Sequence, residues 1–323
     1  MGTYVRTQNI DHVIGEKGNL TLSLRSSDVR LRAAAGAEAH VRATFEIDAA
    51  SDSDADSIFQ EIQLRVAKGE SDLTVEETDH GDLGKIFTRI FRGHGDYELS
   101  VEAELPTEAG LRLSAVSSDV TASDLHGEQR YNTVSGDLSI INAGGSVRVE
   151  TVSGDATIRA DEPLALHAQT VSGDLNIISP TLRSLRANTV SGDIQLEAEL
   201  DADGDFRAET VSGDLSVGLV GSATFEIHGL STDVSSDLDH RLEGQIDRRR
   251  LIIGNGIPRL VYNSMSGDVR IRHPRRITPR AAAAPPQAEP SPAQQEAQLE
   301  VLRALERGEI DVDEATRRLA GGA

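Results

Sequence analysis

The chain has 323 residues, and its 53 acidic and 32 basic side chains give a formal net charge of −21 at pH 7, which disfavours general binding to nucleic acids. Cysteine is absent, which excludes disulfides, thiolate metal sites and a thiol nucleophile. Aromatic residues make up 3% of the chain and tryptophan is absent, which argues against a sugar-stacking platform and is natural for a thin core of Val, Leu, Ile and Ala.

The N-terminal residues carry no sign of export. Residues 1–12 contain no apolar run of the kind found in a signal peptide. No apolar run of about 18 residues occurs elsewhere, so no transmembrane helix is expected. These features predict a cytoplasmic location.

Residues 1–110 are expected to hold divergent strands and a capping segment. Apolar and polar residues alternate in Leu20–Leu24 and again in Val29–Leu31, on either side of Ser26-Ser27-Asp28. This period of two predicts strands that meet at a bend. Three more strands and one acidic loop are predicted here: strands at residues 41–47, 62–66 and 97–105, and the loop at residues 48–56.

One short segment in this part has a helical pattern. Its apolar side chains fall on one face of a helix, with basic side chains beside them. We expect it to cap the open end of the β-structure, where strand edges would otherwise be exposed. A basic amphipathic segment also suits a peptide partner or a membrane surface, so peripheral membrane contact is the alternative. The residues concerned are Ile86, Phe87, Arg89, Ile90, Phe91 and Arg92.

Residues 111–273 are dominated by Thr-Val-Ser-Gly-Asp, which occurs five times without a change at intervals of 18 to 21 residues. In the first copy, apolar Val134, Leu138 and Ile140 alternate with polar residues except at Ser-Gly-Asp, so two short strands meet at a bend. Glycine supplies the positive φ that such a bend needs. The predicted bend residues are Ser135, Gly136, Asp137, Ser153, Gly154, Asp155, Ser172, Gly173, Asp174, Ser191, Gly192, Asp193, Ser212, Gly213 and Asp214.

Repeats of this kind predict an all-β fold, a β-solenoid with about 19 residues per coil. One coil cannot bury its apolar edge, whereas coils stacked at about 4.8 Å share a continuous core. Residues 251–256 are expected to supply the bend of a coil that lacks Ser-Gly-Asp, and residues 260–271 to close the domain.

Stacking also places one aspartate of each coil in a column. Carboxylates about 4.8 Å apart repel by about 0.9 kcal/mol per neighbouring pair even at the dielectric constant of water. We expect each carboxylate to accept hydrogen bonds from its own bend. The alternative is a column that gathers Ca²⁺, although the known calcium-binding solenoid repeat is a glycine-rich nonapeptide. The column comprises Asp119, Asp137, Asp155, Asp174, Asp193, Asp214 and Asp233.

The C-terminal residues change in character. Residues 274–292 are rich in Pro and Ala and predict a semi-extended linker. Residues 293–320 have a helical period and two capping boxes, which predict a two-helix hairpin. Its core is too small for independent stability, which indicates docking on a protein partner or self-association. Its apolar positions are Leu299, Leu302, Leu305, Ile310 and Leu319.

The repeated Thr-Val-Ser-Gly-Asp-Leu coils of residues 10–273 resemble the bacterial putative-adhesin family of β-strand repeat proteins, a domain of largely unknown function. The tail at residues 300–315 is similar to the SHOCT-like short helical module found with that domain in bacterial envelope-stress proteins. In some relatives this module precedes the repeats, whereas here it follows them. The resemblance implies a non-enzymatic role at the cell envelope or surface, and it supplies no catalytic residues.

The sequence therefore indicates a non-enzymatic interaction scaffold without a cofactor. It contains no Gly-x-Ser-x-Gly elbow and no P-loop, and its nine histidines are scattered. Two alternatives stand beside this interpretation. One is a Ca²⁺-dependent surface adhesin, and the other is a cytosolic regulator that recruits a partner through its helical tail.

Overall fold

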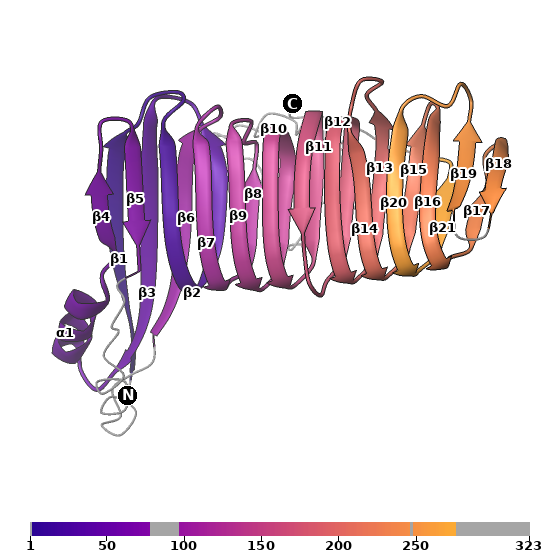
Figure 1. Ribbon diagram of the computed structural model, residues 1–323. Coiled ribbons are helices and arrows are strands. Elements are labelled where there is room, and N and C mark those ends of the chain that lie inside the picture. Colours follow the sequence, from indigo (N-terminus) through magenta and orange to yellow (C-terminus); the bar gives the residue numbers. More distant parts are fainter. Residues whose placement is uncertain (1, 78–96, 246–247, 276–323) are drawn as a thin grey trace, which may run out of the picture. The chain divides into compact units, whose positions relative to one another are not determined.

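The computed structural model describes residues 2–77, 97–245 and 248–275 (Figure 1). These residues belong to one compact unit, Met1–Arg275, and a second unit comprises Arg276–Ala323. The segment at residues 86–92, the linker beyond residue 275 and the predicted hairpin at 293–320 lie outside the described residues.

The described unit is built of coils, each of which contributes one strand to each of two sheet layers. The strand before the bend lies in layer A, and the strand after the bend lies in layer B. Equivalent strands of neighbouring coils pair in parallel: Leu138 lies opposite Ala156, Ala156 opposite Leu175, and Leu175 opposite Ile194. The expected all-β stack of coils is confirmed for this unit.

Some described strands run through both layers, and others lie in one. The long strands are β2 (Asn19–Ala34), β10 (Leu138–Ser153), β11 (Ala156–Gln169) and β12 (Leu175–Ser191). Layer A also contains β5 (Asp72–Glu76), β7 (Gly110–Ser117), β9 (Glu128–Ser135), β14 (Phe206–Ser212), β16 (Ala223–Ser231) and β20 (Arg259–Ser266). Layer B also contains β6 (Tyr97–Pro106), β8 (Val120–Ser123), β13 (Ile194–Leu200), β15 (Leu215–Val220), β17 (Val234–Ser236) and β21 (Val269–Arg272).

Antiparallel strands and a helix complete the N-terminal end (Figure 1). β1 (Gly2–Val13) pairs with β3 (Glu38–Ala49), and β3 pairs with β6. β4 (Arg65–Lys68) pairs with β5. Helix α1 (Asp52–Ile62) packs against β3 and β1.

Helix α1 corrects two expectations from the sequence. Its start lies in the predicted acidic loop at 48–56, and its end lies in the predicted strand at 62–66. The Ser51 hydroxyl caps the helix by accepting the N–H of Asp54 at 3.2 Å. Because only Ala55, Ile58 and Ile62 form the buried stripe, the helical period is too short to stand out among the acidic residues.

The spatial order of the coils differs from their order in the sequence at both ends of the stack. β2 lies between β5 and β7 in layer A, and between β6 and β8 in layer B. At the other end, β20 lies between β14 and β16, and β21 lies between β15 and β17 (Figure 1). The first and the last coil of the chain are thus each held between two others.

Residues 251–256 do not form the coil bend expected for them. β18 (His240–Gln245) and β19 (Arg248–Ile253) form an antiparallel hairpin, and β19 pairs antiparallel with β16. The step of 35 positions from Asp233 to Asp268 therefore comprises this hairpin and a return into the stack. It does not consist of two successive coils.

The core lies between the two layers, where equivalent apolar side chains form columns. In layer B one such column consists of Leu138, Ala156, Leu175, Ile194, Leu215 and Val269, all at most 3% exposed. Full burial of each of its larger side chains contributes about 1.5–3 kcal/mol. Within the described ranges, no helix is long and apolar enough to cross a membrane.

Candidate interaction surface

The residues of each Thr-Val-Ser-Gly-Asp copy point in different directions. Thr133 points into the core and is 5% exposed, whereas Val134 points outward and is 48% exposed. Val134 was expected on the buried edge with Leu138 and Ile140, and this expectation is wrong. The inward alternation of β9 runs through Tyr131 and Thr133, so the next residue faces solvent.

The glycine of each copy lies where layer A passes into layer B and allows neighbouring coils to approach closely. A Cβ atom on Gly173 would lie 2.2 Å from the carbonyl oxygen of Gly154, and one on Gly192 would lie 2.1 Å from that of Gly173. Both glycines also have positive φ, 144° and 152°. The bend therefore requires glycine for its conformation and for its contact with the next coil.

The aspartates form a ladder from coil to coil. Oδ1 of Asp155 accepts the backbone N–H of Asp174 at 2.8 Å, and Oδ1 of Asp174 accepts that of Asp193 at 2.8 Å. The expected hydrogen bonds within each bend are thus made to the next coil instead. Asp268, which the predicted column omitted, stands between Asp214 and Asp233 in this ladder. Among the residues described, no three His, Asp or Glu side chains are placed to hold one metal ion.

The outward apolar residues of successive coils form a continuous exposed strip, which we name the valine row. Its side chains are between 44% and 58% exposed. An apolar strip that runs across consecutive coils is a patch rather than a scatter of single residues. The valine row consists of Val116, Val134, Val152, Val171, Val190, Val211 and Met265.

Two further rows lie on the same outer face of layer A. Two residues before the valine row is a polar row: Ser114, Asn132, Glu150, Gln169, Asn188, Glu209 and Asn263. Four residues before the valine row is the arginine row: Arg112, Arg130, Arg148, His167, Arg186 and Arg207. The Cα atoms of each row are paired in register across adjacent strands.

Most of the arginine row is not neutralised. Arg130 lies 3.8 Å from Glu128, and Arg148 lies 2.6 Å from Glu150. The other arginines of the row, Arg112, Arg186 and Arg207, make no ion pair with a described residue. Unit charges at the coil spacing of about 4.8 Å repel by about 0.9 kcal/mol per neighbouring pair in water. This row is a line of positive charge on an acidic chain, and Glu150 and Glu209 of the adjacent polar row offset part of it.

The pKa of His167 responds to the positive charge of the arginine row. Burial lowers its pKa below the ordinary value, and the nearby Arg148 and Arg186 lower it further. The Nη1 atom of Arg148 lies 3.4 Å from Nδ1 of His167. The imidazole is therefore held in its neutral form at pH 7.

Three hollows formed by described residues lie on the outer face of layer A. A hollow of about 340 Å³ lies among Arg130, Arg148, His167 and Arg186, and the acidic Glu128 and Asp205 also line it. A second, of about 490 Å³, follows Val116, Val134 and Val152, and a third, of about 580 Å³, adjoins Val211 and Met265. The hollows follow the arginine row and the two ends of the valine row.

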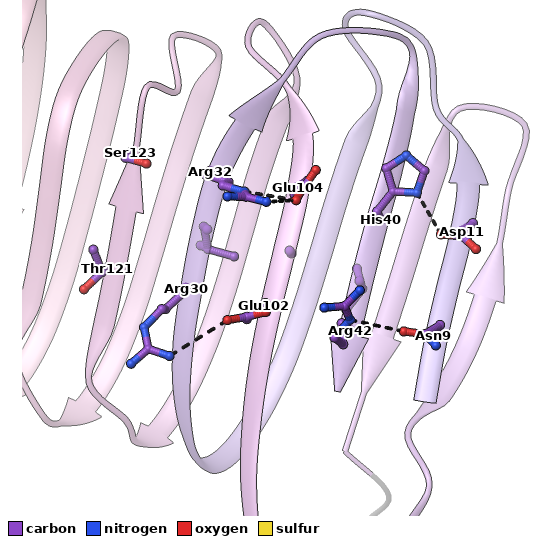
Figure 2. A pocket seen from close by; sticks show the side chains of 13 residues that line it. Asn9, Asp11, Arg30, Arg32, His40, Arg42, Glu102, Glu104, Thr121 and Ser123 are labelled. Carbon is purple, nitrogen blue, oxygen red and sulfur yellow. Dashed lines mark hydrogen bonds and ion pairs between the residues drawn. The ribbon is translucent and has the colours of Figure 1, made fainter. Parts of the chain in front are cut away.

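A different hollow of about 660 Å³ lies on the outer face of layer B at the N-terminal end (Figure 2). Its charges pair across strands. Arg30 pairs with Glu102, and Arg32 with Glu104. His40 Nδ1 lies 2.7 Å from Asp11, and Arg42 donates to Asn9 at 3.4 Å (Figure 2). Because these groups satisfy one another, cross-strand pairing is their structural role.

Sequence reasoning missed the valine and arginine rows, although a signal for them was present. A basic residue stands four positions before the exposed valine in each of the five copies: Arg130, Arg148, His167, Arg186 and Arg207. The predicted contact residues at 86–92 and the predicted tail positions lie outside the described residues, so those predictions stay open.

Comparison with known proteins places this fold in a family. A family model described as Toastrack DUF4097 matches residues 19–272. The chain belongs to the Toastrack family. No curated protein sequence matches this Toastrack chain. The expected membership in a family of uncharacterised β-proteins is therefore confirmed for the coils, and the similarity of the tail to a SHOCT-like module stays a prediction.

Several solved structures are distantly similar to the Toastrack chain. A putative cell adhesion protein from Clostridium sporogenes is 9% identical, with 84% of this chain and 100% of that chain covered and a TM-score of 0.28. A putative adhesin from Bacteroides fragilis is 11% identical, with 82% and 97% covered and a TM-score of 0.38. A putative adhesin from Parabacteroides merdae is 13% identical, with 83% and 95% covered and a TM-score of 0.27.

Proposed function

We propose that this Toastrack protein is a non-enzymatic scaffold that binds a protein partner at the bacterial cell envelope. The valine row carries the proposal. Stacking of the coils requires the bend glycine, but it does not require an apolar residue at the exposed valine position. Threonine has a similar shape and β propensity and would leave less apolar surface in water. Repetition of valine there therefore supports a role in contacting another molecule.

The envelope location is supported by the resemblance of the coils and the tail to bacterial surface and envelope-stress proteins. It is also compatible with a strongly acidic surface, because the net charge of −21 keeps the protein from non-specific binding to other polyanions. A scaffold acts by binding and not by catalysis. We assign the binding to the outer face of layer A.

The test is a variant that makes four central positions of the valine row polar, V134S/V152S/V171S/V190S. Full-length protein is produced in bacterial cells, cross-linked and fractionated. We expect wild-type protein to be recovered in the envelope fraction with a cross-linked partner, and the variant to lose both. The matched control, S139A/T157A/N176A/Q195A, changes the outer face of layer B in the same coils and should behave as wild type. Recovery of all three proteins in the soluble fraction without a partner would contradict the proposal.

Two other functions give different results in the same cells. A Ca²⁺-dependent surface adhesin would lose its partner on chelation of calcium, and substitutions in the aspartate ladder such as D174N would have the same effect. A cytosolic regulator would stay in the soluble fraction and lose its partner on deletion of residues 293–323. The scaffold proposal predicts that neither treatment abolishes the contact made by the valine row.

A further inference from the structure

The outer face of layer A combines apolar surface with positive charge that the protein itself leaves unsatisfied. Arg112, Arg186 and Arg207 have no ion-pair or hydrogen-bond partner among the described residues. Several polar atoms between and within the rows are shielded from solvent and also lack a hydrogen-bond partner. These atoms are Arg130 Nε, Asn132 Oδ1, His167 Nε2 and Asn188 Oδ1. The three arginines therefore leave positive charge that an acidic ligand can pair beside an exposed apolar strip, whereas the shielded atoms are out of a ligand's reach.

The spacing of the rows sets the size of the ligand. Arg130 and Val134 are four residues apart on one strand, which is about 13 Å at about 3.3 Å per residue. An α-helix with its side chains is about 10–12 Å wide. A helix that lies over the polar row would therefore contact the valine row on one side and the arginine row on the other.

The repeat along the rows also fits a helix. One helical turn rises about 5.4 Å, and one coil advances about 4.8 Å, so each turn of a helix parallel to the stack would meet about one coil. The six positions from Arg112 to Arg207 span about 24 Å, which corresponds to a helix of about 16 residues.

We propose that this face binds an amphipathic α-helix of the partner protein, with apolar residues along one side and Asp or Glu along the adjacent side. The inference rests on the proposed scaffold function and names the chemistry of its partner. The apolar side packs on the valine row, and the acidic side pairs with the arginine row. An extended strand is a poorer fit, because the backbone groups within layer A are already paired. A linear polyanion would leave the valine row uncovered.

The experiment measures binding of a fluorescein-labelled, lactam-bridged helical peptide of about 16 residues to the full-length chain by fluorescence anisotropy. The peptide carries Leu along one side and Glu along the adjacent side. The control peptide has Lys in place of each Glu. We expect the acidic helix to bind at least about tenfold more tightly than the basic helix, and added salt to weaken its binding.

Matched variants of the protein locate the contact. R186Q/R207Q, in the arginine row, should weaken binding of the acidic helix by about tenfold. R42Q/R159Q removes the same charge from exposed arginines on the outer face of layer B and should change it by less than about twofold. V134S/V152S/V171S/V190S should also weaken binding. Unchanged melting temperatures and circular dichroism spectra show that each variant keeps its fold.

Three results would overturn the inference. One is no binding of the acidic helix up to about 1 mM. Another is equal binding of the acidic and basic helices. The third is that R186Q/R207Q weakens binding of heparin, a linear polyanion, and leaves binding of the acidic helix unchanged. In each case, loss of the envelope partner by the valine-row variant would still support the scaffold function. Failure of the helix proposal can therefore be distinguished from failure of the scaffold proposal.

Discussion

At the scale of single residues, four of the five positions in each repeat have distinct structural roles. Threonine faces the core, valine faces solvent, glycine allows the next coil to approach, and aspartate accepts a hydrogen bond from that coil. Gly173 and Asp174 show why glycine and aspartate recur in all five copies. Both residues act on the neighbouring coil, so each copy depends on the copies beside it.

The glycine requirement leads to a stability prediction. G173A should lower the free energy of unfolding by about 3–5 kcal/mol, because a Cβ atom would combine backbone strain with a contact 2.2 Å from the Gly154 carbonyl oxygen. The control is G36A. Gly36 also has positive φ, 121°, but a Cβ there meets nothing within 4 Å, so the cost should be about 1–2 kcal/mol. Urea denaturation measures both values, and equal losses would show that the close approach is unimportant.

His167 gives a prediction on pH. Its pKa is lowered by burial first and then by Arg148 and Arg186. As the pH falls below about 6.5, the unfolded chain binds a proton that the folded chain resists, so this histidine reduces stability. The reduction stops growing once the pH is below the folded-state pKa. Titration of His167 by NMR should give a midpoint below about 6.5 that rises in R186Q and is unchanged in R65Q. A wild-type midpoint at or above that value would contradict the positive field.

At the scale of elements, the order of the coils is the main departure from the sequence reading. Successive steps of about 19 residues favour neighbours in sequence as neighbours in space. The chain instead places β20 and β21 between the coil of β14–β15 and the coil of β16–β17. The sequences of the bends agree with this spatial order. Gly267 belongs to a Ser-Gly-Asp bend, and a Cβ atom there would lie 2.0 Å from the Gly213 carbonyl oxygen, whereas Ser231-Thr232-Asp233 of the outer coil has no glycine.

Engineered disulfides test this order, because the chain has no cysteine of its own. Arg207 and Val261 are paired across adjacent strands, so R207C/V261C should form a disulfide on mild oxidation. Glu226 lies beyond Val261 in the stack, about 9.6 Å from Arg207, so R207C/E226C should not. Gel mobility with and without reductant shows the result. Cross-linking of R207C/E226C alone would show that the coils instead stack in the order of the sequence.

At the scale of the whole molecule, the sequence predicts the β-coils and their spacing but not the surface that the coils present. Period-two alternation and the repeat length are local properties, so they identify strands, bends and the stack. The direction of Val134 depends on the phase of alternation in β9, and the repeated apolar residue was read as core. The arginine row emerges only when residues 18 to 21 positions apart are aligned across coils. α1 was missed because its buried stripe has three residues.

In the proposed function, the outer face of layer A, and not that of layer B, contacts the partner. Site-specific photo-cross-linking in bacterial cells tests it most directly, with benzoylphenylalanine at Val152 or Val190 of the valine row. Thr157 and Gln195, on the outer face of layer B in the same two coils, are the controls. We expect a discrete cross-linked partner from Val152 and Val190 and none from Thr157 and Gln195. Cross-links from the layer B positions alone, or from none of the four, would contradict it.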